Sequence, residues 1–105
     1  SREGQFAEKL HAYTRPRDGG SNSRVKDLID MVLLIDLGLD SVRLQKDLNK
    51  TFARRKSHLL PASLEAPPDF WRNPYEALAR ECGLSKDIDE GFRRVSDFYI
   101  ENNFI

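Results

Sequence analysis

Apolar residues recur along this chain at intervals of three and four positions, the spacing of one face of an α-helix. The strict alternation that is typical of a β-strand is nearly absent. Phe6, Leu10 and Tyr13 form the first apolar stripe, and Pro16 prevents it from continuing. We therefore expect a first helix from about Gln5 to Tyr13.

The second expected helix begins after Ser23, a residue type that caps helices well, and ends near Leu37. Gly38 follows at the position where a left-handed residue often ends a helix. This segment is apolar nearly all round, so it should be the central helix of the fold. Between the two helices, the composition of residues 17–22 predicts a turn-rich loop.

Helix-capping residues precede three more helical segments. Asp40 stands before a third helix, Asn73-Pro-Tyr-Glu76 is typical of the start of a fourth, and Asp87 precedes a fifth. The fourth helix should end near Cys82 and Gly83. The apolar positions of the third and fifth helices are Leu44, Leu48, Phe52, Ile88, Phe92, Val95 and Tyr99.

Residues 57–68 contain three of the five prolines, which predicts an extended segment that crosses the surface. The apolar side chains expected to hold this part of the chain against the core are Leu59, Leu60, Leu64, Phe70 and Trp71. The sequence as a whole predicts an all-α fold of about five helices, with residues 1–105 forming a single domain.

The composition narrows the range of functions. Lys+Arg 17 balance Asp+Glu 17, so net charge gives no general argument for binding nucleic acid or a membrane surface, although local patches still can bind. Cys82 is the only cysteine, which excludes an internal disulfide and favours a reducing, cytoplasmic location. No apolar run approaches the roughly 20 residues that span a bilayer, so we expect no membrane partner.

Two aspartates interrupt the apolar surface of the second expected helix. Asp27 and Asp30 are three residues apart, so their carboxylates project from neighbouring positions, and Lys26 is close enough in sequence to pair with Asp30. In a structural interpretation, Asp27 stabilises the helix N-terminus and Asp30 forms an ion pair. In a functional one, either aspartate orients a basic group or accepts a proton at the mouth of a cleft. Spacing alone does not choose between them.

Basic residues offer further candidate chemistry. Lys9 borders the first apolar stripe, where a lysine either lies along the surface or binds phosphate as a point charge. Arg54, Arg55 and Lys56 close the third expected helix, where cations are favoured by the helix dipole but could also contact nucleic-acid phosphates. His58 has no cysteine or second histidine at ligand spacing, so we expect no metal site there.

Several segments together resemble the C-terminal half of the AbiEii/AbiGii toxin family of nucleotidyltransferases. The most specific element is Arg-x-Lys-Asp-x-x-Asp, formed by Arg24, Lys26, Asp27 and Asp30, with Lys9 upstream. The segments that carry the resemblance are residues 5–12 (QFAEKLHA), 23–30 (SRVKDLID), 51–58 (TFARRKSH), Leu60-Pro61 and 74–79 (PYEALA).

This resemblance implies a DNA polymerase β-like nucleotidyltransferase fold and a bacterial toxin of abortive-infection systems, neutralised by an antitoxin. Such a protein transfers a nucleotide from a nucleoside triphosphate to RNA or another acceptor with the help of magnesium. The resemblance implies that Lys9, Arg24 and Lys26 bind the nucleotide. It places Asp27 and Asp30 in the catalytic site, where they orient groups or assist deprotonation of the acceptor.

Family members also carry an upstream, sheet-containing half with a Gly-Ser element and paired magnesium-binding aspartates, which this sequence does not contain. We therefore expect a C-terminal helical portion that holds no metal itself and is inactive without the metal-binding half. The alternative is a non-catalytic helical interaction module that binds an antitoxin or a second copy of itself. Either would present a contiguous apolar patch, and ionisable groups beside that patch would favour the enzyme.

Overall fold

The computed structural model describes residues 1–16 and 23–104, so the loop predicted at 17–22 lies outside the described residues. Within those two ranges the chain forms helices and no strand, which confirms the predicted all-α class and the number of helices. The helices are α1 (Arg2–Thr14), α2 (Val25–Leu37), α3 (Ser41–Arg55), the single 3-10 turn η1 (Asp69–Trp71), α4 (Arg72–Glu81) and α5 (Ile88–Asn102). The implied DNA polymerase β-like fold stays a prediction.

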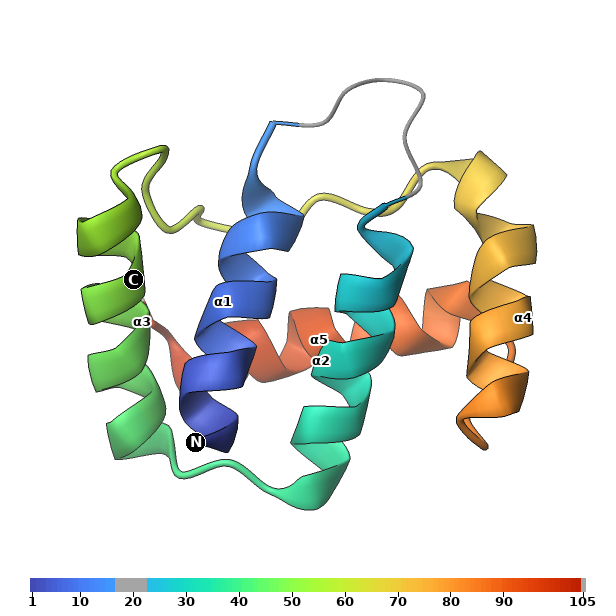
Figure 1. The fold of residues 1–105 in the computed structure, drawn as a ribbon, viewed down its shortest axis with the longest axis horizontal. Helices are drawn as coiled ribbons and strands as arrows, with labels where there is room; N and C mark the ends of the chain where they lie inside the picture. The colour runs from blue at the N-terminus through green and yellow to red at the C-terminus, as the bar shows by residue number, and fades with distance from the viewer. Residues whose placement is uncertain (17–22, 105) are drawn as a thin grey trace.

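Four helices lie side by side in the order α3, α1, α2, α4, and α5 runs across behind them (Figure 1). Helix α1 packs between α2 and α3, whereas α2 contacts α1, α4 and α5. Leu28 and Met31 of α2 have no exposed surface. The predicted central position of this apolar helix is therefore correct, and it places the Asp27 side of α2 beside α1.

Side-chain caps fix the starts of three helices. The Asp40 carboxylate accepts the backbone N–H of Arg43 at 3.2 Å, and Asp87 accepts that of Asp89 at 2.9 Å, so both capping predictions are confirmed. Ser1 Oγ accepts the N–H of Gly4 at 3.1 Å. Because this serine caps α1, the helix begins at Arg2, earlier than its apolar stripe indicates.

Two predicted caps are wrong. Helix α2 is capped by Arg24 rather than Ser23, and the Arg24 side chain makes no capping hydrogen bond. Helix α4 begins before Asn73, because η1 leads directly into it and Trp71 occupies the cap position. Trp71 is fully buried, so the packing of its ring, rather than a capping side chain, determines where α4 begins.

The end of α2 is as predicted. Gly38 has a positive φ of 95° and donates its N–H to Ile35 O at 3.1 Å.

The segment between α3 and η1 crosses the molecule in an extended form, as predicted. Tyr13 Oη donates to Glu65 O at 2.7 Å and Tyr99 Oη donates to Pro61 O, which holds the segment to α1 and α5. Leu64 is buried, but Leu59 is 88% exposed and Phe70 is 49% exposed, so those two predictions are wrong. Leu59 and Leu60 are neighbours in an extended segment, so their side chains point in opposite directions and only Leu60 packs against the core. Phe70 lies in the 3-10 turn η1, where the next residue, Trp71, is the buried one.

Candidate functional site

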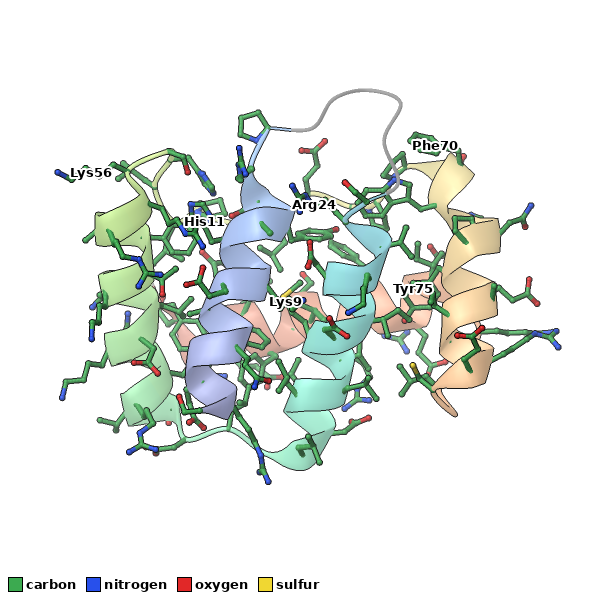
Figure 2. All side chains as sticks on the ribbon, viewed as in Figure 1. Lys9, His11, Arg24, Lys56, Phe70 and Tyr75 are labelled. Carbon is green, nitrogen blue, oxygen red and sulfur yellow. The ribbon has the colours of Figure 1, made fainter. Side chains whose placement is uncertain are left out.

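The predicted lysine and the two predicted aspartates meet where α1 lies against α2. Lys9 Nζ lies 2.9 Å from Asp30 Oδ2 and 3.5 Å from Asp27 Oδ1. Figure 2 shows Lys9 between these two helices, with Arg24 at the beginning of α2. The fold therefore brings together residues that the sequence places on separate segments.

Two more predicted residues join this group, Arg24 from the cap position of α2 and Lys26 from its first turn. Arg24 Nη1 lies 3.2 Å from Asp27 Oδ2, and Lys26 Nζ lies 3.3 Å from Asp30 Oδ2, which confirms the local pairing of Lys26 with Asp30. We call these five side chains the Lys9 cluster. It contains three cations and two carboxylates, so its formal charge is +1 when all five are ionised (3 − 2 = +1).

The helix geometry of α2 explains why the carboxylates share one face. Residues three apart on a helix are neighbours, so Asp27 and Asp30 both turn toward α1, and residues four apart allow Lys26 to reach Asp30. Asp27 also lies in the first turn of α2, where the helix dipole favours a negative charge. The structural interpretation of Asp27 is thus compatible with the geometry, as is the functional one.

Burial differs strongly across the Lys9 cluster. The Asp27 side chain is 10% exposed and that of Lys9 is 31% exposed, whereas Lys26 is 71% exposed. The hydrogen bond from Lys9 to Asp30 raises the pKa of the lysine and outweighs the opposing effect of its partial burial. Lys9 therefore stays charged at neutral pH, held at the partly buried base of the cluster.

This arrangement suits an anionic ligand better than a metal ion. Asp27 directs one oxygen at Lys9 and the other at Arg24, so cations already occupy both sides of its carboxylate. Among the described residues, no group of three or more His, Cys, Asp or Glu side chains could hold a metal. The cluster does not fit magnesium, because hard cations need several oxygen ligands free of competing positive charges.

A groove of about 510 Å³ opens on the other side of Lys9, between α1 and α3. Glu8 and Lys9 line it from α1, and Asp47, Lys50 and Arg54 line it from α3. Lys9 thus borders both the groove and the contact with α2. Neither Asp27 nor Asp30 lines this groove.

The cation run at the end of α3 is partly neutralised. Arg55 pairs with Glu8 at 2.8 Å, and Arg54 pairs with the other oxygen of the same carboxylate. These contacts, Arg55 first, lower the pKa of Glu8. Lys56 remains exposed and points away from the helices (Figure 2). Nucleic-acid binding at this end of the molecule stays a prediction.

A further polar group lies outside every site predicted from the sequence. His11 of α1 and His58 of the crossing segment have ring centroids 4.7 Å apart, and Ser57 Oγ contacts both rings. Sequence spacing does not indicate this contact, because His11 and His58 are distant in sequence and become adjacent only when α1 packs beside α3.

The large apolar side chains exposed in the described part of the chain do not come from one helix. They are Leu37, Val42, Leu59, Phe70 and Ile100, one each from α2, α3, the crossing segment, η1 and α5. The interaction-module hypothesis stays a prediction. No described helix is both long and apolar enough to span a bilayer.

The comparisons with known proteins define the class as a toxin-related nucleotidyltransferase. A family model described as "Nucleotidyl transferase AbiEii toxin, Type IV TA system" matches residues 1–98, and the chain belongs to this AbiEii family. Membership in a type IV toxin–antitoxin family implies an antitoxin partner. Neither a curated protein nor a solved structure shows significant similarity to the chain.

Proposed function

We propose that the Lys9 cluster binds the triphosphate of a nucleoside triphosphate during nucleotide transfer to an RNA or other acceptor. In this proposal Lys9, Arg24 and Lys26 contact phosphate oxygens. The observation that carries it is the position of Lys9 Nζ, 2.9 Å from Asp30 and 3.5 Å from Asp27, which holds a cation between two helices. Fixed positive charges are what phosphoryl-type transfer needs most, because its transition state spreads negative charge over oxygens.

The three cations have donors to spare for such a ligand. A lysine ammonium carries three N–H groups and an arginine carries five, whereas each has only one or two partners within the cluster. Arg24 and Lys26 are more exposed than Asp27, so an incoming triphosphate can reach them from solvent. The net positive charge of the cluster favours the anion further.

Asp27 and Asp30 serve this site by positioning the cations. Asp27 lies between Lys9 and Arg24, and Asp30 lies between Lys9 and Lys26. A general base needs an oxygen that can approach the acceptor hydroxyl, and cations flank both oxygens of Asp27. Orientation of the cations is therefore the better supported of the two roles considered for Asp27. The described residues include no group of three or more His, Cys, Asp or Glu side chains that could hold a metal ion, so a metal ion used in transfer would need further ligands from elsewhere.

The same contacts would exist if the cluster only fastened α1 to α2. The two interpretations differ in what happens when a charge is removed without loss of the fold. A fastening role predicts a change in stability alone, whereas a binding role predicts a loss of nucleotide transfer in a protein that remains folded.

The test is transfer of labelled nucleotide to RNA by the protein encoded by the longest reading frame that contains these residues. Lys9→Ala and Asp27→Ala should each lower the rate by about a hundredfold or more, roughly 3 kcal/mol. Lys46→Ala is the matched control, because Lys46 is an exposed lysine of α3 outside the cluster. Full activity of both cluster variants would remove the assignment.

A further inference from the structure

Four polar side chains form a continuous hydrogen-bonded series beside α1, which we call the Ser57 network. His11 Nε2 lies 2.7 Å from Ser57 Oγ, which lies 2.9 Å from His58 Nδ1. His58 Nε2 then lies 2.7 Å from Thr14 Oγ1, which lies 2.9 Å from the carbonyl oxygen of Leu10. Figure 2 shows His11 on the side of α1 that faces α3, whereas Lys9 lies on the side toward α2. The network is thus distinct from the Lys9 cluster.

The last contact fixes the direction of every hydrogen bond in the Ser57 network. A carbonyl oxygen only accepts, so Thr14 must donate its single hydroxyl proton to Leu10 O and accept a proton from His58 Nε2. A neutral His58 protonated at Nε2 carries a lone pair at Nδ1, which accepts the Ser57 hydroxyl proton. Ser57 Oγ then accepts the N–H at His11 Nε2.

We propose that Ser57 is an activated nucleophile and a site of covalent modification by phosphoryl electrophiles, with His58 as its general base. In this assignment the Ser57 hydroxyl donates a hydrogen bond to the lone pair at His58 Nδ1. Thr14 accepts the N–H at Nε2 on the opposite edge of the same ring. This is the arrangement of nucleophile, base and orienting group that activates a serine. His11 contributes an N–H that stabilises negative charge developing on Oγ.

The surroundings suit this chemistry. Ser57 is exposed, so a reagent can reach its hydroxyl, whereas His11 is only 5% exposed. Burial lowers the pKa of both imidazoles, and the positive charge of Arg15 lowers them further, so His58 is a neutral base at pH 7. For His11, the positive charges of His58 and Arg55 lower the pKa ahead of Arg15, whereas the negative charge of Glu8 raises it. The nearby arginines favour an electrophile that carries or develops negative charge on its oxygens.

The step balances without any further reactant. Ser57 Oγ attacks the phosphorus atom and forms an O–P bond, while the bond from phosphorus to the leaving group breaks. The hydroxyl proton moves to His58 Nδ1, and the leaving group departs with the bonding electron pair. The product is a phosphoserine ester in which Oγ still accepts the His11 N–H.

The test uses an alkyl fluorophosphonate as the probe, on the 105-residue chain, with the labelled residue identified by tandem mass spectrometry. Here fluoride is the leaving group. We expect labelling at Ser57 and not at Ser63, an exposed serine of the same segment. The rate should fall as the pH drops and His58 becomes protonated, because an imidazolium cannot accept the serine proton.

Two variants separate catalysis of this step from a structural role. His58→Asn keeps a hydrogen-bond acceptor near Nδ1 but removes the base, so labelling should slow by at least tenfold in a protein whose circular dichroism is unchanged. Thr14→Val removes the group that holds the His58 ring and should slow labelling to a lesser degree. Labelling of Ser57 no faster than Ser63 overturns the proposal. So does a labelling rate at Ser57 that is the same in His58→Asn as in the unchanged protein. A rate that does not change with pH would also overturn it, and that result needs only the unchanged protein.

Discussion

Lys9 and Asp30 form an ion pair across two helices, with 2.9 Å between Nζ and Oδ2. The lysine side chain is 31% exposed and that of the aspartate is 24% exposed, so water screens the pair only in part. The contact therefore does two things. It fastens α1 to α2, and it fixes an ammonium group where an anionic ligand could bind.

The fastening role can be measured with a double-mutant cycle. Lys9→Met and Asp30→Asn should each lower the free energy of unfolding by about 1 kcal/mol, and the coupling energy should be about 0.5–1 kcal/mol, as for a partly screened pair. Urea denaturation of the four proteins supplies the values. Strict additivity would mean that the pair contributes nothing to stability.

A tight contact between α4 and α5 gives a second prediction. A Cβ added at Gly91 would lie 1.9 Å from Tyr75 Oη and 2.8 Å from Tyr75 Cζ, and the Tyr75 ring is buried between α4 and its neighbours (Figure 2). Gly91→Ala should therefore destabilise the protein by about 1–3 kcal/mol through overpacking. Gly4→Ala is the control, because the nearest atom to its new Cβ is a serine hydroxyl at 3.2 Å. Equal stabilities of the two variants would contradict this packing.

The Ser57 network predicts how stability depends on pH. The pKa of His11 and that of His58 are both lowered from 6.5, first by burial and then by nearby cations. Near pH 6 the unfolded chain therefore binds more protons than the folded chain, so stability falls as the pH drops through 6.5. Urea denaturation at pH 7.5, 6.5 and 5.5 should show this loss, and a His11→Gln, His58→Gln double variant should show less of it. An identical pH dependence in the double variant would exclude these two imidazoles as the cause.

The capping bond of α3 allows a simpler test of local structure. Asp40 accepts the N–H of Arg43, and Asp40→Ala leaves that donor without its partner. The expected cost is about 1 kcal/mol in the free energy of unfolding. Asp40→Asn keeps an oxygen acceptor and should recover most of the loss. Thermal denaturation that does not distinguish alanine from asparagine would contradict the assigned cap.

The sequence predicts much of this fold because its helical signals are local. Asp40 and Asp87 cap the helices they precede, since the bonded N–H groups lie only a few residues away. Ser23 and Asn73 are also residue types that favour the cap position, but the cap positions of α2 and α4 are occupied by Arg24 and Trp71. The burial of Trp71 determines where α4 begins, and this tertiary packing cannot be predicted from the few residues around the helix start.

The candidate sites differ in the same way. Lys26 and Asp30 are one helical turn apart, so their pairing follows from the sequence alone. The convergence of Lys9 with Asp27 was expected only through the family resemblance, because it depends on how α1 packs against α2. The contact between His11 and His58 depends on how α1, α3 and the crossing segment pack together, so the spacing of residues along the sequence does not predict it.

Direct titration of the 105-residue chain with ATP, GTP, CTP and UTP tests the central proposal most simply. At least one triphosphate should bind, and Lys9→Gln should weaken its binding at least tenfold, about 1.4 kcal/mol. Lys46→Gln makes the same change of charge on an exposed part of α3 and should alter the affinity less than twofold. Equal affinities in the two glutamine variants, or no binding of any triphosphate by the unchanged chain, would contradict a nucleotide site at Lys9.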